Sequence, residues 1–287
     1  MNNQPTTQLH SLDLITLIQD LKNICYQASD AIMAIYNGHD IEAQQKADKS
    51  PITAADIAAH HIIAKQLKAL TPDIPLLSEE GEHTPLAERL SWQRYWCIDP
   101  VDGTKEFIAK TGEFTVNIAL VEQGQPLFGI ICQPTNKALW WGGKSVGAWK
   151  QTFNQEATRI KTRSLSKQLT VIASRRHGKE RNQHIMARVL DRFDQVFFED
   201  CGSSLKMCRI AEGTADFYPR CFPTCEWDTA AAQAIIEGSG GLLVNAHSLH
   251  PLSYNQRETL VNPYFYVIGD PHFPLTSLKT PAANSHV

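Results

Sequence analysis

Four strand-like segments between residues 114 and 150 constrain the fold of this chain more than any other feature of its sequence. Gly, Pro and Asn turn residues separate these segments, which span residues 114–122, 126–133, 137–141 and 146–150. Consecutive short strands that are joined by tight turns pair with their neighbours in antiparallel order. The sequence therefore predicts an antiparallel meander.

Helical patterns precede this meander. Apolar residues recur at steps of three and four over residues 14–35 and again over residues 53–70, which predicts two amphipathic helices. Thr53 and Asp56 have the spacing of a capping box at the start of the second helix. A short strand is expected at residues 75–78.

The pattern changes to alternating strands and helices after residue 169. We expect strands at 170–173, 195–199 and 215–218, and helices at 179–190, 203–212 and 228–237. The change occurs over residues 151–168, so we place a boundary there between two lobes, residues 1–155 and 156–287.

Composition narrows the class of protein. The chain has 287 residues, 43% of them hydrophobic and 20% charged, as is ordinary for a folded protein. Its net charge of −3 gives no general attraction to nucleic acid, so we expect no nucleic-acid partner. The N-terminus lacks the features of a signal peptide, and no segment approaches the length of a membrane span. Seven scattered cysteines without a Cys-x-x-Cys pair are typical of reduced thiols, so we expect a cytoplasmic protein.

Residues 99–104, with the sequence DPVDGT, combine groups that suit a metal ion and a phosphate. Two carboxylates lie three residues apart, and the carbonyl of Val101 could add a neutral ligand for Mg²⁺. Gly103 lets the backbone approach a ligand closely. An apolar run at 95–98 predicts a strand that ends at the motif, where Pro100 is expected to set a turn. A surface β-turn without a ligand is the alternative.

Carboxylates also occur at Asp56, at the pair Glu79-Glu80 and at Asp228. Each has a simple structural explanation, such as a helix cap or a solvated loop. If they came together they would repel one another, and divalent cations would be needed to neutralise them.

Three motifs in this order resemble the inositol monophosphatase superfamily. They are SEE at 78–80, DPVDGT at 99–104 and WDTAA at 227–231, and the resemblance spans roughly residues 46–245. It implies a Mg²⁺-dependent, lithium-sensitive phosphomonoesterase. It also implies the fold of this superfamily and of fructose-1,6-bisphosphatase, an α/β (α+β) layered sandwich with the active site between two lobes.

Further motifs resemble the bacterial CysQ-type branch, the 3′(2′),5′-bisphosphate nucleotidases. These motifs are GTKEF at 103–107, GEFTVNIAL at 112–120, GSSLK at 202–206 and YPR at 218–220. The branch removes the 3′-phosphate of adenosine 3′,5′-bisphosphate (PAP), a by-product of sulfate assimilation, to give AMP. 3′-Phosphoadenylyl sulfate (PAPS) is a second candidate substrate.

The resemblance implies the metal ligands. Glu79, Asp99 and the Val101 carbonyl would hold a first Mg²⁺, and Asp99, Asp102 and Asp228 a second. Asp99 would bridge the two ions. A third ion near Glu79 is an alternative count.

It also implies the catalytic groups. Thr104 would orient the attacking water, with Asp56 as its proton acceptor and Glu79 acting through the metal. The amides of Gly103 and Thr104 would contact the phosphate. The residues at the metals, Glu79, Val101, Asp102 and Asp228, would also line the substrate site.

The family analogy assigns the nucleotide and its second phosphate to Ser203, Lys206 and Arg220, with His177 beside the base. Two of these have plain alternatives. Lys206 could be a solvated helix residue, and Arg220 a partner for Glu226.

Other functions have less support. The GKS sequence at 143–145 lacks the first glycine of a P-loop, and Ser203-x-x-Lys206 lacks the other motifs of an acyl-enzyme. A phosphatase of the same fold that acts on inositol phosphates or fructose 1,6-bisphosphate is the nearer alternative, and a silent nucleotide-binding module is a third. The resemblance further suggests a homodimer, and a peripheral position on the cytoplasmic face of the inner membrane is an alternative location.

Overall fold

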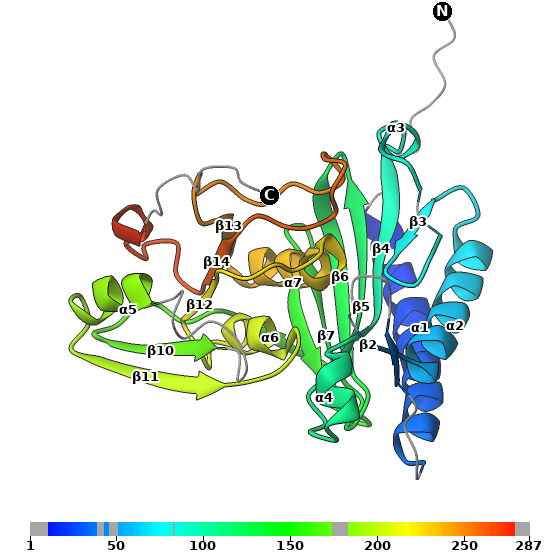
Figure 1. Ribbon diagram of the computed structural model, residues 1–287, viewed down its shortest axis with the longest axis horizontal. Coiled ribbons are helices and arrows are strands. Elements are labelled where there is room, and N and C mark those ends of the chain that lie inside the picture. The colour runs from blue at the N-terminus through cyan, green and yellow to red at the C-terminus, as the bar shows by residue number, and fades with distance from the viewer. Residues whose placement is uncertain (1–10, 39–42, 46–50, 83, 174–182, 279–287) are drawn as a thin grey trace, which may run out of the picture.

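The structure is a computed structural model that describes residues 11–38, 43–45, 51–82, 84–173 and 183–278. Helices and sheets alternate in layers, as Figure 1 shows. In order, the layers are the helices α1 (Ser11–Tyr36) and α2 (Ala54–Leu70), a seven-stranded sheet, the helices α6 (Leu205–Ala211) and α7 (Glu226–Ser239), a five-stranded sheet, and the helix α5 (Gln183–Leu190) with the 3₁₀ helix η1 (Leu275–Leu278). This confirms the predicted α+β layered sandwich.

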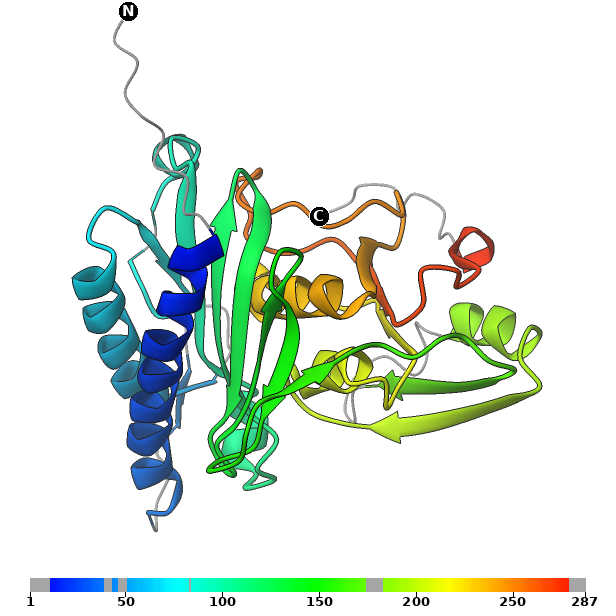
Figure 2. The ribbon, with the colours of Figure 1, turned by 180° about the vertical axis from the view of Figure 1, so that it is seen from behind.

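The outer helices α1 and α2 cover one face of the seven-stranded sheet (Figure 2). Their buried residues, among them Leu21 and Ile63, pack against Trp96 and its neighbours in the sheet. Thr53 caps α2, and its backbone N–H donates to the Asp56 carboxylate at 2.8 Å. The capping box that the sequence predicts is therefore present.

The seven-stranded sheet has the order β3-β4-β5-β6-β7-β8-β9. Its strands are β3 (Leu76–Ser78), β4 (Arg94–Asp102), β5 (Thr115–Glu122), β6 (Gln125–Gln133), β7 (Ala138–Gly143), β8 (Gly147–Gln151) and β9 (Thr158–Ile160). The strands β4 to β9 pair in antiparallel order, which confirms the meander, and β3 is parallel to β4. A separate pair, β1 (Ala43–Gln45) and β2 (Pro51–Thr53), precedes α2.

The five-stranded sheet has the order β11-β10-β12-β14-β13. Its strands are β10 (Gln168–Ala173), β11 (Gln195–Asp200), β12 (Phe217–Arg220), β13 (Leu242–Asn245) and β14 (Phe265–Ile268). The first three agree with the predicted strands to within a few residues. The strands β13 and β14 were not predicted, because four-residue strands carry little periodicity and these two pair across a long loop.

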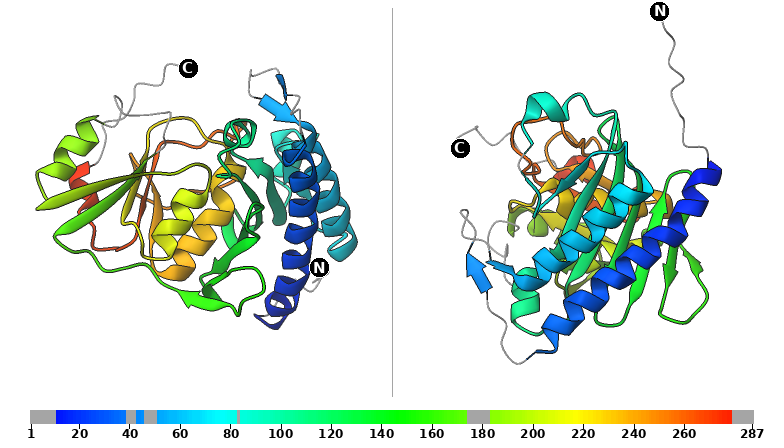
Figure 3. Two further views of the ribbon diagram at one scale, coloured as in Figure 1. Left: turned by 90° about the horizontal axis from the view of Figure 1, so that it is seen from below. Right: turned by 90° about the vertical axis from the view of Figure 1, so that its right-hand side faces the viewer.

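The helices α6 and α7 lie between the two sheets (Figure 3). One side of α7 packs against β5, β6 and β7, and the contact is close at Gly129 of β6. A Cβ at Gly129 would lie 2.2 Å from the carbonyl oxygen of Ala231. The position of α7, which begins at the cleft described below, therefore depends on this glycine.

The predicted turn at Pro100 is wrong. Pro100 lies inside β4, where the pairing with β5 shifts register between Asp99 and Asp102. Proline has no N–H to donate, and a bulge leaves a residue unpaired, so a bulge accommodates it without loss of a hydrogen bond. The chain turns only at Gly103, whose φ of +95° is left-handed, and the helix α4 (Thr104–Ile108) follows.

None of the helices in the described part of the chain has the length and apolar character needed to cross a membrane.

The close packing of α7 on the sheet predicts a large effect of Gly129→Ala. The added methyl would meet helix backbone that cannot rotate away, so we expect a loss of about 3 kcal/mol in the free energy of unfolding. Urea denaturation measures this loss. Gly269→Ala is the matched control, because its Cβ would meet nothing closer than 3.6 Å; it should cost less than about 1 kcal/mol. Equal losses would contradict this account of the packing.

Candidate active site

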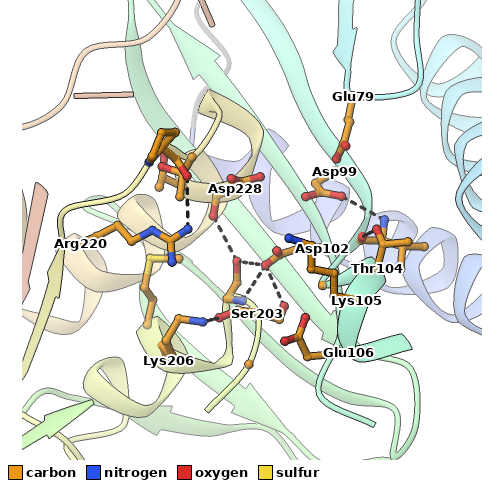
Figure 4. Close-up of a pocket in the computed structure, with 18 of the residues that line it drawn as sticks. Glu79, Asp99, Asp102, Thr104, Lys105, Glu106, Ser203, Lys206, Arg220 and Asp228 are labelled. Carbon is orange, nitrogen blue, oxygen red and sulfur yellow. Dashed lines mark hydrogen bonds between the residues drawn. The ribbon is translucent and has the colours of Figure 1, made fainter. Parts of the chain in front are cut away.

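Three carboxylates from separate elements converge at one end of the sheets. The parallel pairing of β3 with β4 places Glu79 beside the end of β4, and the Glu79 N–H donates to the Ile98 carbonyl at 3.1 Å. Asp228 arrives from the first turn of α7. One oxygen from each of Glu79, Asp99 and Asp228 lies within 4.8 Å of the others (Figure 4).

The surroundings of these carboxylates oppose their ionisation. Asp99 is buried, and burial raises its pKa well above the ordinary value, with further contributions from the charges of Glu79, Asp102 and Asp228. Burial, followed by the charges of Asp102 and Glu79, raises the pKa of Asp228 from 3.8 to about 8. Hard carboxylate oxygens in this number are the donor set that Mg²⁺ prefers. The residues therefore fit a divalent cation, which would remove the repulsion between them.

Asp102 lines the same cleft but is oriented by two serines that directly precede α6. Its Oδ2 accepts from the Ser203 hydroxyl at 2.7 Å, from the Ser204 N–H at 2.6 Å and from the Ser204 hydroxyl at 2.7 Å. Asn117 and Thr115 extend this network through the two serines. With Oδ2 fixed in this way, Oδ1 is the oxygen through which Asp102 could add a ligand to the cluster.

A hydroxyl and a carboxylate stand next to the acidic cluster. Thr104 lies at the start of α4, and its hydroxyl donates to Asp56 Oδ1 at 3.3 Å. The other oxygen of Asp56 accepts from the N–H and the hydroxyl of Thr53, so the cap of α2 holds the carboxylate in place. The Thr104 hydroxyl is also 3.3 Å from the Val101 carbonyl oxygen. This arrangement can hold a proton between Thr104 and Asp56.

Gly103 lies between the acids and this hydroxyl. Besides its left-handed φ, a Cβ here would lie 3.1 Å from the Glu113 carbonyl oxygen and 3.3 Å from the Ser203 Cβ. Glycine is therefore needed both for the conformation and for the close approach of Glu113 and Ser203.

Two cations lie across the cleft from the acids. The ammonium group of Lys206 donates to the carbonyls of Ser203 at 2.6 Å and Cys201 at 3.4 Å, and the side chain is buried. The guanidinium of Arg220 donates to the carbonyls of Phe222 at 3.3 Å and Pro223 at 3.2 Å. Lys206 is thus not a solvated helix residue.

Neither cation is paired with a carboxylate among the described residues. The alternative in which Arg220 pairs with Glu226 is wrong, because Glu226 instead contacts Asn255 and Arg257.

The cleft has a volume of about 320 Å³ and brings together nearly all the residues that the sequence singles out. His177 lies outside the described residues. The predicted site residues that line the cleft are Glu79, Asp99, Val101, Asp102, Gly103, Thr104, Ser203, Lys206, Arg220 and Asp228. Asp56 lies behind Thr104.

Sequence reasoning missed several residues of the cleft. Ser204, Lys105 and Glu106 line it and stand inside motifs quoted for the family resemblance, so their position beside assigned residues could have indicated them. Tyr218 also lines it, inside the YPR motif. Phe265 had no such signal, since it lies in the unpredicted strand β14.

Comparison with known proteins agrees with this geometry. The model of the inositol monophosphatase family matches residues 14–270. The chain therefore belongs to the inositol monophosphatase family, and the predicted resemblance is confirmed over a longer stretch than the motifs covered.

Curated relatives and a solved structure are similar along most of their length. The chain is 43% identical to the 3′(2′),5′-bisphosphate nucleotidase CysQ of Salmonella typhimurium, over 88% of this chain and 99% of the relative. It is 34% identical to the protein of the same name from Haemophilus influenzae, over 92% of this chain and 98% of the relative. The crystal structure of CysQ from Bacteroides thetaiotaomicron superposes with a TM-score of 0.77 at 35% identity, covering 88% of this chain and 97% of that one.

The raised pKa values predict that Mg²⁺ and protons compete for the site. An acid whose pKa is higher in the folded state stabilises the fold below its ordinary pKa, and this contribution is lost as the pH rises through the folded value, here about 8 for Asp228. The metal-free protein should thus lose stability as the pH rises from the ordinary pKa of 3.8 to the folded value of about 8, and Mg²⁺ should restore it.

We therefore expect the rise in melting temperature caused by Mg²⁺ to be larger at about pH 8.5 than at about pH 6. Differential scanning fluorimetry with and without Mg²⁺ measures it, with NaCl at equal ionic strength as the control. A rise of the same size at both pH values would contradict the proton competition.

Proposed function

We propose that this protein is a Mg²⁺-dependent phosphomonoesterase that hydrolyses the 3′-phosphate of PAP, giving AMP and inorganic phosphate. PAPS is a second candidate substrate. One observation carries the proposal: an acidic cluster suited to metal ions lines the same cleft as two cations that form no ion pair with any carboxylate in the described part of the chain. A ligand with two phosphates can place one at each end. The names of the CysQ relatives support a nucleotide as that ligand.

The proposed metal ligands are Glu79, Asp99 and the Val101 carbonyl for one Mg²⁺, and Asp99, Asp102 and Asp228 for a second. Bound Mg²⁺ would neutralise charge on the phosphate and the carboxylates and lower the pKa of water in the site. Two ions, with a third near Glu79 as the alternative, stay a prediction.

Thr104 and Asp56 would manage the proton of the attacking water. The Thr104 hydroxyl would orient the water by accepting from it, while its own proton points to Asp56 Oδ1. Asp56 can then take up the proton that hydrolysis releases, because the Thr53 cap holds its other oxygen. The amides of Gly103 and Thr104 would contact the phosphate oxygens.

The second phosphate would lie against Lys206 and Arg220. Both are partly satisfied by neutral carbonyl oxygens, which hold the side chains in place but do not cancel their charge. The positive charges of the buried Lys206 and the half-buried Arg220 would attract a phosphate. Ser203 contributes less directly, since its hydroxyl is engaged with Asp102 and Thr115.

Some finer expectations stay predictions. They are the placement of His177 beside the base, a homodimer, the absence of a nucleic-acid partner, and a cytoplasmic location with or without a peripheral membrane association.

A side-by-side assay tests the proposed substrate. Phosphate release with Mg²⁺ should be at least about 100-fold more efficient, as kcat/KM, for PAP than for inositol 1-phosphate, and it should also be more efficient for PAP than for fructose 1,6-bisphosphate. Inositol 1-phosphate lacks a second phosphate, whose charge-assisted contacts contribute about 1.5–3 kcal/mol each, and every 1.4 kcal/mol is about tenfold. A preference for either of the other substrates would overturn the proposal.

Thr104→Ala is the control that links the activity to this cleft. It should lower kcat on PAP by about 100-fold or more, because the water loses its orienting group. A wild-type protein that binds PAP but releases no phosphate would instead identify a silent nucleotide-binding module.

A further inference from the structure

Two charged side chains outside the cleft are completely buried and lie on either side of one asparagine. Arg89, at the end of α3 (Leu86–Arg89), and Glu226, the first residue of α7, are each 0% exposed, and Asn255 is 3% exposed. Buried charges are costly unless hydrogen bonds compensate them. The contacts around Asn255 compensate Arg89 and one oxygen of Glu226, and the guanidinium of Arg257 lies 3.8 Å from the other oxygen.

Arg89 is held by oxygen atoms of a loop that spans residues 254–262. Its guanidinium donates to Asn255 Oδ1 at 2.5 Å and to the Glu258 carbonyl at 3.1 Å. A third donor reaches back to the Thr84 carbonyl at 2.9 Å. The side-chain amide of Asn255 donates to the Arg89 carbonyl at 2.7 Å, so the pair is bound in both directions. Figures 1 and 2 place α3 and the orange segment that contains this loop at the same end of the molecule.

The same loop holds the start of α7. The backbone N–H of Asn255 donates to Glu226 Oε2 at 2.8 Å, and the Glu226 N–H donates to the Leu260 carbonyl at 2.9 Å. Asn262 donates to the Cys225 carbonyl at 2.7 Å. The first turn of α7 is therefore fixed at three points of one loop.

These contacts join the segments that carry two of the clustered carboxylates. Asp228 lies in the same first turn of α7, and its carboxylate accepts from the Cys225 N–H at 2.9 Å, so its position follows that of the helix start. Glu79 directly follows β3, and it precedes α3 and Arg89 by only a few residues in the chain. Glu79 and Asp228 repel one another, and hydrogen bonds between α3, the loop and the start of α7 oppose the separation of the segments that carry them.

We propose that Asn255, bound by Arg89 on one side and binding Glu226 on the other, is a positioning residue that holds Glu79 and Asp228 together and thereby sets the affinity of the site for Mg²⁺. The inference rests on the proposed metal site, but it is independent of which phosphate ester is the substrate. A site whose ligands are held in place binds a metal more tightly than one whose ligands must first be brought together against repulsion.

Asn255→Gly tests this directly. Asn255 has a left-handed φ of +56°, which glycine adopts without strain, so the variant removes the side-chain amide and keeps the backbone. Asn154→Gly is the matched control, because Asn154 has a φ of +61° and is exposed between β8 and β9. Calorimetric titration with Mg²⁺ should give a Kd raised by about tenfold for Asn255→Gly, as is typical when a residue supporting a metal ligand is lost. The control should stay within about twofold of the wild type.

A merely structural role would lower thermal stability without changing the Kd for Mg²⁺. A folded Asn255→Gly protein with wild-type Mg²⁺ affinity would thus overturn the inference. If that variant fails to fold, Arg89→Lys makes the same test, since lysine keeps the charge but cannot reach all the oxygens that the guanidinium reaches. A Kd raised by about tenfold would again support the inference, and an unchanged Kd would overturn it. Failure of the wild type to bind Mg²⁺ would instead contradict the proposed function.

Discussion

Repulsion between Glu79, Asp99 and Asp228 is the constraint on which the rest of the structure depends. Their oxygens lie within 4.8 Å of one another, Asp99 is buried, and the pKa of Asp228 is raised to about 8. A chain would not assemble such a cluster unless the elements that carry it were each held independently. The fold holds these elements by strand pairing, by helix capping and by packing with hydrogen-bonded links.

These are ordinary interactions of backbone and side-chain groups. The parallel ladder between β3 and β4 fixes Glu79 beside the end of β4, and the bulge between Asp99 and Asp102 accommodates Pro100 there. The capping interactions of α7 fix Asp228. Packing of α7 against Gly129, together with the proposed link through Asn255, then joins the two halves of the cluster. Stable elements hold the cluster in place, so the binding of a divalent cation does not have to order them.

Two positively charged side chains lie in the same cleft as the acidic cluster. Carbonyl oxygens hold Lys206 and Arg220 on the far side of the cleft. The cleft, with a volume of about 320 Å³, therefore has a negative end and a positive end. Bound divalent cations would neutralise the negative charge of the acidic end and so remove its repulsion toward a phosphate. The whole cleft would then accept a ligand that carries a phosphate at each end, which is the physical basis of the proposed preference for a bisphosphate.

Local patterns predicted much of this structure. The capping box of Thr53 and Asp56 and the meander were predicted correctly. Both depend on residues that are neighbours in the sequence, through short-range hydrogen bonds and through the alternation of strands with turns. The family motifs indicated the acids. The expected turn at Pro100 was wrong because local propensity cannot distinguish a turn from a bulge that tertiary pairing imposes.

Long-range contacts could not be predicted in this way. Arg89 and Asn255 are 166 residues apart in the chain, and nothing in either local sequence indicates their pairing. The same holds for Ser204 and Asp102, which are 102 residues apart. In the second case, only the folded arrangement reveals that a polar side chain orients a residue of the cleft.

Asp99 is the residue of the acidic cluster that we propose to bind metal together with both Glu79 and Asp228. Mn²⁺, a spin-active substitute for Mg²⁺, allows binding to be counted by electron paramagnetic resonance in the wild type and in Asp99→Asn. The account predicts that the folded Asn variant loses at least about 100-fold in Mn²⁺ affinity, because removing a shared carboxylate weakens every ion that it contacts. Binding of Mn²⁺ with wild-type affinity by that variant would contradict it.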